Sequence, residues 1–164
     1  VLLEPSDGPN GLLDWILRSD GSGAQFLYMP GGGSLNPSTA ETVNKKMHYV
    51  HQNGRNVFKF AVKGMVEVSR NILERNNLTK NDVKLYVPHQ ANLRIIKSAA
   101  EKLKLEKSQV AINIDRYANT TAGTIPICLS EASLNGGVVD GDLLLLASFG
   151  AGFTWGSVLL RWGT

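Results

Sequence analysis

The sequence contains a single cysteine, Cys128, among its 164 residues. One thiol cannot form a disulfide within the chain or supply a cysteine-based metal site, and this scarcity fits a reducing compartment. The sequence also lacks an apolar run of the roughly 18 residues that a membrane-spanning helix needs, and it opens without the basic and apolar segments of a signal peptide. We therefore expect a cytoplasmic protein that binds no metal and contacts no membrane.

Charged residues are modest in number as well. They make up 19% of the sequence, against 43% hydrophobic residues, which is the composition of a globular domain with a core and excludes disordered and collagen-like classes. The formal net charge of +3 indicates a mildly basic surface, which suits an acidic partner or a phosphorylated ligand. Because the aromatic residues are not interleaved with basic ones, we expect no nucleic-acid partner.

Hydrophobic periodicity predicts helices alternating with strands. Apolar residues recur at helical spacing over 56–76 and over about 90–104, which predicts two helices with one buried face each. Residues 143–147 are all apolar, as in a strand buried on both faces. Residues 30–38 are glycine-rich but lack the lysine and the helix of a phosphate-binding loop, so we expect a surface loop. Further strands are expected over 1–3, 12–18, 84–87, 111–114 and 153–162, with the first two forming a hairpin, whereas 41–50 is ambiguous.

The clearest chemical signal is a histidine at a strand-to-helix turn. The apolar run 85–87 ends at Pro88 and His89, just before the second helical pattern. Ligand crevices form at this end of a strand in α/β sheets. The positive end of the helix dipole would also disfavour an imidazolium here, which favours a neutral hydrogen-bond donor. The alternative is a hydrogen-bonded structural histidine.

Asn119 is the second candidate, for the same topological reason. It follows the strand expected over 111–114 and precedes a helix that carries Pro126 in or near its first turn. Two such turns of one parallel sheet open onto the same edge, so we expect the side chains of His89 and Asn119 to meet there. Two converging neutral donors form an oxyanion hole, which can stabilise the enolate of a thioester that has lost carbon dioxide.

No residue of the sequence completes this pair as a nucleophile. Cys128 lies in a helical apolar pattern without a basic neighbour that would lower its pKa, so we expect a core residue. Ser130 and Ser148 lack the sequence context of an activated hydroxyl. The remaining catalytic group must come from elsewhere.

Three segments, Val87–Ile96, Tyr117–Pro126 and Phe149–Ser157, closely resemble the β-ketoacyl-acyl carrier protein synthase III family and occur in its order. The resemblance implies an α/β, thiolase-like fold of two similar halves. This chain would be the C-terminal half-domain, with a mixed, mainly parallel sheet packed against helices. Residues 1–10 would then be the tail of the preceding N-terminal half, and residues 11–164 the C-terminal domain.

The resemblance also implies an acyltransferase activity. The family uses a Cys–His–Asn triad for the decarboxylative condensation of malonyl-acyl carrier protein with an acyl primer from acyl-CoA, which initiates fatty acid synthesis without a cofactor. His89 and Asn119 fall on its His and Asn, while its nucleophilic Cys belongs to the N-terminal half, so this chain alone is expected to be inactive. The implied partners are acyl carrier protein, acyl-CoA, the N-terminal half of the same protein, and a second copy in a homodimer.

Further positions carry over from the family. Lys59 and Arg94 match its basic patch for the acidic carrier protein, although Glu101–Lys102 stands where the family has a lysine pair. The positions that match the lining of its pantetheine channel are Gly54, Val57, Phe58, Ala91, Asn92 and Phe149.

Two alternatives remain open. One is a related Cys–His–Asn enzyme, such as a type III polyketide synthase or a hydroxymethylglutaryl-CoA synthase, although the run Pro88–Asn92 favours synthase III. The other is a non-catalytic module that binds acyl thioesters. A cysteine in a small-residue turn upstream of Val1 would argue for the enzyme.

Overall fold

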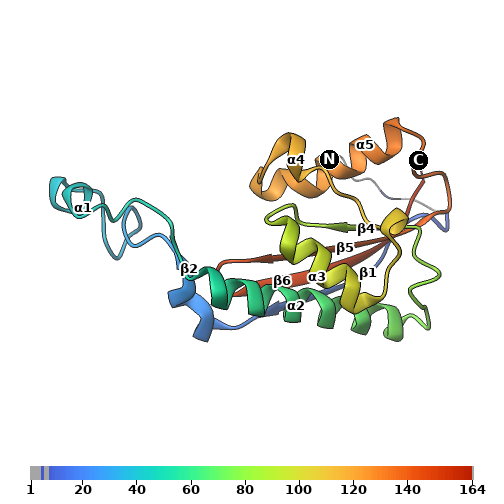
Figure 1. Cartoon of the computed structure of the whole chain (residues 1–164), viewed down its shortest axis with the longest axis horizontal. Helices are drawn as coiled ribbons and strands as arrows, with labels where there is room; N and C mark the ends of the chain where they lie inside the picture. The colour runs from blue at the N-terminus through green and yellow to red at the C-terminus, as the bar shows by residue number, and fades with distance from the viewer. Residues whose placement is uncertain (1–4, 6–7, 164) are drawn as a thin grey trace.

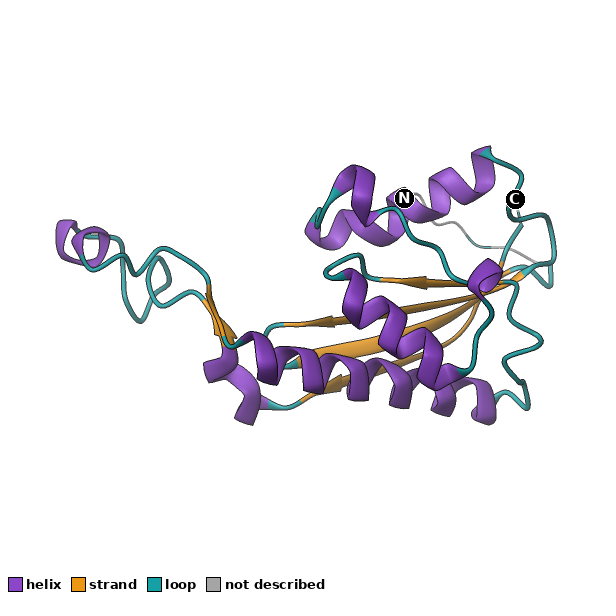
Figure 2. Ribbon diagram, viewed as in Figure 1, coloured by secondary structure: helices purple, strands orange, loops and turns teal. Residues whose placement is uncertain are grey.

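A four-stranded mixed sheet organises the chain in this computed structural model, which describes residue 5 and residues 8–163. The strand order is β1–β6–β5–β4, and the sheet appears edge-on behind the helices in Figures 1 and 2. The strands are β1 (Gly11–Ser19), β4 (Leu85–Pro88), β5 (Leu143–Gly150) and β6 (Thr154–Arg161). The expected strand over 1–3 and its hairpin lie outside the described residues.

The sheet is mixed, as predicted, but it is not mainly parallel. Among the described strands only β4 and β5 pair in parallel, whereas β5–β6 and β6–β1 are antiparallel. The reason is the connection length: β5 and β6 are joined by the short turn 151–153, which reverses the chain, while β4 reaches β5 by a long crossover that contains helices.

The prediction of a strand over 111–114 is wrong. Val110 forms one isolated parallel bridge to Tyr86, and the chain then enters the short helix α4 (Ile114–Tyr117). Pairing stops there because the side chain of Gln90 takes the next backbone hydrogen bonds: its Nε2 donates to Ala111 O (3.2 Å), and its Oε1 accepts from Asn113 N (3.1 Å).

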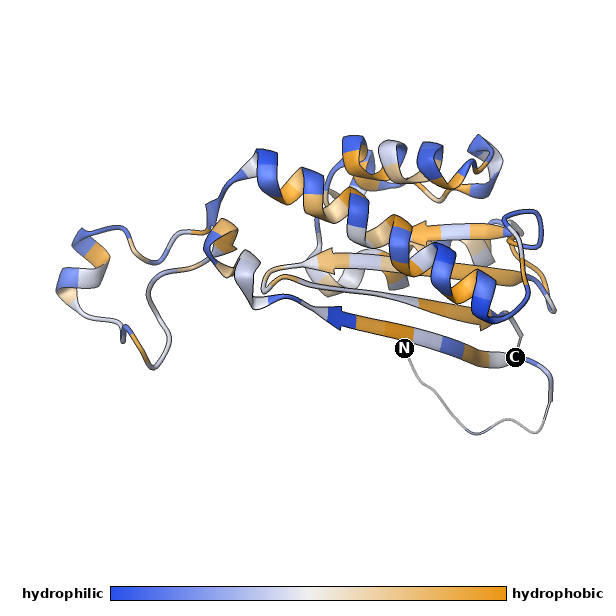
Figure 3. Cartoon of the chain, turned by 90° about the horizontal axis from the view of Figure 1, so that it is seen from below, coloured by the Kyte–Doolittle hydropathy of each residue, from blue (hydrophilic) through white to orange (hydrophobic). Residues whose placement is uncertain are grey.

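Helices cover both faces of the sheet. Helix α2 (Gly54–Arg75) and helix α3 (Leu93–Leu103) pack on one face, and helix α5 (Thr124–Leu134) packs on the other. The central strand β5 alternates between them, with Leu145 in the core under α2 and Leu144 in the core under α5. This confirms the prediction that the apolar run 143–147 is buried on both faces. In Figure 3 the apolar segments accordingly gather on the strands and on the helix faces against them.

Side-chain caps set where the two long helices begin. Asn53 accepts a hydrogen bond from Asn56 N (3.1 Å), so α2 starts two residues before the predicted position. Asn92 accepts from Arg94 N (2.9 Å) and starts α3 at Leu93 rather than near 90. The four residues between β4 and α3, His89 to Asn92, are therefore a tight, non-helical turn.

An arm extends from the body between β1 and α2 (Figure 1). Its base is formed by the 3-10 helix η1 (Gly21–Phe26) and by the antiparallel pair β2 (Leu27–Tyr28) and β3 (His51–Gln52), and helix α1 (Ala40–Asn44) lies near its tip. The ambiguous stretch 41–50 is thus helical in part, and residues 30–38 form the expected loop. Two further 3-10 turns are η2 (Lys107–Gln109) and η3 (Thr121–Gly123). None of the helices in the described ranges combines the length and apolarity needed to cross a membrane.

The packing predicts that Leu145→Ala strongly destabilises the chain. Leu145 is fully buried between the sheet and α2, and deleting such a side chain removes its transfer free energy and leaves a cavity, at a cost of about 2–5 kcal/mol. Denaturant unfolding measures the change. Leu134→Ala is the control, because Leu134 is 83% exposed and its truncation should change stability by no more than about 0.5 kcal/mol. Similar losses for the two variants would contradict this packing.

Candidate functional site

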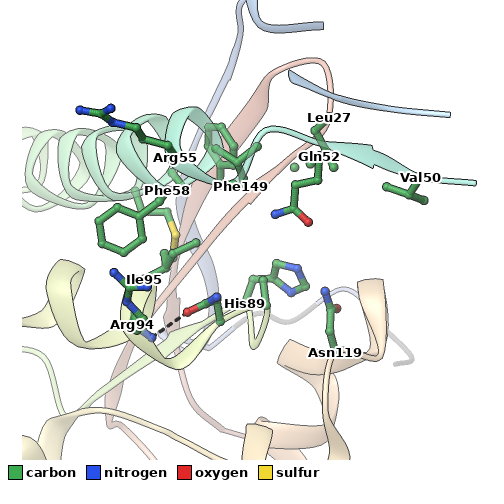
Figure 4. Close-up of a pocket in the computed structure, with 17 residues that line it drawn as sticks. Leu27, Val50, Gln52, Arg55, Phe58, His89, Arg94, Ile95, Asn119 and Phe149 are labelled. Carbon is green, nitrogen blue, oxygen red and sulfur yellow. Dashed lines mark hydrogen bonds between the residues drawn. The ribbon is translucent and has the colours of Figure 1, made fainter. Parts of the chain in front are cut away.

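A pocket of about 720 Å³ opens at the end of the sheet where β4 stops, and its volume suits a small-molecule ligand. Its walls come from α2, the β4–α3 turn, the end of β5, the loop before η3 and the base of the arm (Figure 4). It is lined by all the predicted site residues but one: His89, Asn119, Gly54, Val57, Phe58, Ala91, Asn92, Arg94 and Phe149. Lys59 is exposed on α2 and does not line the pocket.

His89 is fixed to the sheet through its backbone. Its N–H donates to Ala147 O (2.8 Å), which continues the parallel β4–β5 ladder one residue beyond Pro88, and its C=O accepts from Ala91 N (3.0 Å). The half-buried imidazole lies with its Nδ1 atom 2.6 Å from the hydroxyl oxygen of Thr124. The ring is therefore held from behind by α5, and its Nε2 edge is left for the pocket.

Burial lowers the pKa of His89 below its ordinary value of 6.5. The direction is the one predicted from the helix dipole, but the cause is the loss of hydration of the charged form. The imidazole is therefore neutral at physiological pH, so one of its ring nitrogens carries a hydrogen and the other is an acceptor.

Asn119 is oriented by a backbone hydrogen bond. Its side-chain oxygen Oδ1 accepts from Thr121 N (2.9 Å), so the amide nitrogen is the end that remains for a ligand. In the view of Figure 4 that nitrogen is turned toward His89. Asn119 thus presents its amide N–H to the pocket that His89 also lines, and two N–H donors in such a pocket can bind a carbonyl oxygen as it gains negative charge.

The loop that carries Asn119 is anchored by a carboxylate on α5. Glu131 accepts hydrogen bonds from Asn113 Nδ2 (2.8 Å), Arg116 NH2 (2.7 Å) and Tyr117 OH (3.0 Å), which hold α4 against α5. The hydrogen bond from Asn113, which has the largest effect, and those from Tyr117 and Arg116 keep the pKa of Glu131 below its usual value. Helix α4 ends two residues before Asn119, so this cluster sets the position of Asn119.

Gln90 connects the two donor loops. It is fully buried, and its side chain donates to Pro88 O (2.8 Å) and Ala111 O and accepts from Asn113 N. All its polar groups therefore bond backbone, and they join the turn of His89 to the segment that leads to Asn119.

The pocket wall on α2 is largely apolar, and the outer surface next to it is basic. Phe58 packs under the guanidinium of Arg94, whose carbon lies 5.4 Å from the ring centroid. Arg94 itself is exposed, as is Arg55 on α2. The arrangement suits a long, mostly apolar ligand with an anionic group outside.

The sequence analysis missed several lining residues. Ala61 and Met65 continue the helical stripe of Gly54, Val57 and Phe58 on α2, and the spacing of four residues was the signal that could have found them. Leu27, Val50 and Gln52 come from the base of the arm. Nothing in their local sequence indicates this position, which depends on the pairing of β2 with β3.

Cys128 is buried in the core under α5, as predicted. Burial, and then the charge of Glu131, raises the pKa of its thiol to about 11, which disfavours the thiolate that a nucleophile requires. In the part of the chain that the structure describes, no three His, Cys, Asp or Glu side chains are grouped as metal ligands would be.

Comparisons with known proteins agree on one family. The family described as 3-oxoacyl-[acyl-carrier-protein (ACP)] synthase III C terminal matches residues 73–162. The β-ketoacyl-[acyl-carrier-protein] synthase III of Koribacter versatilis is 55% identical over 99% of this chain, which corresponds to 49% of that protein. The enzyme of the same name from Chlorobium phaeobacteroides is 52% identical over 99% of this chain and 50% of that protein.

A solved structure shows the same fold. The 3-oxoacyl-[acyl-carrier-protein] synthase III of Aquifex aeolicus superposes with a TM-score of 0.84 at 39% identity, over 96% of this chain and 46% of that one. The fold is therefore thiolase-like, as the sequence motifs indicated. The chain spans about half the length of the curated relatives it matches.

The burial of His89 predicts its titration. Between the lowered folded-state pKa and the unfolded value near 6.5 the unfolded chain binds more protons, so this residue contributes stability at neutral pH that is lost as the pH falls through that window. NMR titration of the imidazole should give a pKa below 6.5. The signal is identified by its absence in His89→Ala, and a pKa at or above the ordinary value would contradict the burial of the ring.

Proposed function

Because the chain belongs to the 3-oxoacyl-[acyl-carrier-protein] synthase III family, in its C-terminal part, we propose that it provides the decarboxylation site of such a condensing enzyme. In this proposal His89 and Asn119 bind the thioester carbonyl oxygen of malonyl-acyl carrier protein. The bond to the carboxylate carbon breaks, carbon dioxide leaves, and the electron pair forms an enolate whose oxygen is held by the two N–H groups. The enolate carbon then attacks the acyl group of an acylated cysteine and releases its thiolate.

The observation that carries this proposal is the orientation of the two donors. The oxygen of Asn119 is engaged by Thr121 N, which leaves its amide N–H for the pocket. The contact of His89 Nδ1 with the hydroxyl of Thr124 leaves Nε2 of the neutral ring on the pocket side. Enolate formation by loss of carbon dioxide needs stabilisation of an oxyanion but no proton abstraction. Removing one donor of this kind typically costs about 2.7–4 kcal/mol of barrier.

The apolar wall of the pocket suits the pantetheine arm of the substrates. Gly54, Val57 and Phe58 line the pocket from α2, and Ala91, Asn92 and Phe149 line it from the β4–α3 turn and the end of β5. A pantetheine chain lying along them would deliver its thioester to the two donors.

We assign Arg94 and Lys59 to the docking surface for an acidic acyl carrier protein. Arg94 lines the pocket. Lys59, which follows Phe58 on α2, is exposed. Positive charge beside the pocket would attract an acidic protein and orient its prosthetic group toward the opening.

The rest of the site would come from the other half of the complete protein. In this proposal residues 1–10 end the N-terminal half, residues 11–164 form the C-terminal domain, and the N-terminal half supplies the nucleophilic cysteine, so the chain alone is inactive. The complete enzyme would be a cytoplasmic homodimer that takes its primer from acyl-CoA, needs no cofactor and initiates fatty acid synthesis.

The donor role predicts a split between the two half-reactions. In the complete protein, His89→Ala and Asn119→Ala should each reduce decarboxylation of malonyl-acyl carrier protein about 10²–10³-fold or more, because each removes a donor to the enolate. Acyl transfer from acyl-CoA to the cysteine should stay measurable. Release of labelled carbon dioxide and labelling of the protein by radioactive acyl-CoA measure the two steps, and equal loss of both would argue against the donor role.

The docking role predicts a selective effect of charge reversal at Arg94. Arg94→Glu should raise the KM for malonyl-acyl carrier protein about tenfold and leave the KM for acyl-CoA less affected, since an exposed charge acts mainly on encounter with a charged protein. Lys102→Glu makes the same charge change near the other end of α3 and serves as the matched control. An unchanged KM for the carrier protein would remove Arg94 from the docking surface. Steady-state assays with malonyl-CoA in place of the malonyl carrier would also identify an enzyme of the polyketide synthase type.

A further inference from the structure

Thr124, the first residue of α5, contacts the imidazole of His89 from behind the pocket. It is 2% exposed and does not line the pocket, so it would not touch a substrate. We propose that the hydroxyl of Thr124 is a positioning group that donates its proton to Nδ1 of His89 and thereby fixes the tautomer in which Nε2 carries the hydrogen. The proposal rests on the proposed function, in which His89 acts as a donor.

The hydroxyl of Thr124 has one proton and two neighbours that could accept it. Its oxygen lies 2.6 Å from His89 Nδ1 and 3.1 Å from Thr121 O. If the proton goes to Thr121 O, the hydroxyl must accept from an Nδ1–H group, and Nε2 becomes a bare acceptor. If the proton goes to Nδ1, then Nε2 carries the hydrogen of the neutral ring.

The two distances favour donation to His89. Hydroxyl donors usually lie about 2.5–3.0 Å from an oxygen acceptor, and N–H donors usually lie about 2.7–3.2 Å from theirs. The separation from Thr121 O is longer than the first range, and the separation from Nδ1 is shorter than the second. A hydroxyl-to-nitrogen bond accounts for the short contact, and the carbonyl is left as a weak secondary neighbour.

The same short segment orients both donors of the pocket. The N–H of Thr121 holds the oxygen of Asn119, and the side chain of Thr124, three residues later, holds the ring of His89. The first contact occupies the amide oxygen of Asn119, and the second occupies Nδ1 of His89, so that the hydrogen of the ring is on Nε2. An acceptor at either position would repel the enolate, so the segment 121–124 decides the polarity of the site.

The test compares Thr124→Val with Thr124→Ser in the complete protein. Valine keeps the shape of the side chain and removes the hydroxyl, whereas serine keeps the hydroxyl. Nitrogen-15 NMR of labelled histidine, with His89 assigned by its absence in His89→Ala, shows which ring nitrogen carries the hydrogen. We expect the Nε2–H form in the wild type and in Thr124→Ser, and a mixture of both forms in Thr124→Val.

The kinetic arm measures decarboxylation of malonyl-acyl carrier protein. The valine variant should lose about tenfold to a hundredfold in kcat, less than the ~10²–10³-fold loss expected when a donor is removed outright. Its KM should change less than about twofold, because uniform binding of the substrate is unaffected. Thr124→Ser should restore most of kcat. Thr124→Ala, which also lacks the hydroxyl, replaces the valine variant if that variant does not fold.

The outcomes separate this inference from the proposed function. A hydrogen on Nδ1 in the wild type, or the same tautomer with and without the hydroxyl, would overturn the role of Thr124 even if the enzyme is active. A tautomer that depends on Thr124 in a complete protein that releases no carbon dioxide would uphold the inference about the ring and overturn the proposed function. A loss of kcat in Thr124→Val without a change in tautomer would point to packing alone and contradict the proposal.

Discussion

The parallel pairing of β4 with β5 is the interaction on which the site depends. It holds the end of β4, the edge strand, against β5, and the bond from His89 N to Ala147 O extends the ladder to the histidine itself. The backbone of His89 is thus held by the sheet as that of a strand residue is, although His89 lies in a turn. The crossover that a parallel pair requires then supplies α3, which forms part of the pocket, and α5, which holds the ring.

The second constraint is a set of hydrogen bonds that fixes the loops carrying His89 and Asn119. Gln90 and Glu131 bond only to groups of the turn, the crossover and α4, and they fix where the two donor loops lie. The backbone N–H of Thr121 fixes which end of the Asn119 amide is free. Preorganised donors of this kind do not have to reorganise when charge develops, which is why they stabilise an oxyanion better than water does.

The long periodic patterns predicted α2 and α3 well, because burial of one helix face leaves a regular trace in the sequence. The position of His89 and Asn119 at strand-to-helix turns predicted that they meet, and both line one pocket. The strand expected over 111–114 was wrong, because a side chain distant in sequence, Gln90, displaced the pairing. The mainly parallel sheet was wrong because a tight glycine turn between β5 and β6 favours a hairpin.

The sequence by itself predicted His89 and Asn119 as site residues, the motifs of the family and the apolar stripe of α2, since all three are written in local order or in periodic spacing. Only the tertiary structure decided which polar groups face the pocket, which parts of the arm line it, and which partner holds the imidazole. Those contacts join residues from separate elements, such as His89 in the β4–α3 turn with Thr124 on α5. Local propensity carries no information about such pairs, because their geometry follows from how the helices and strands pack together.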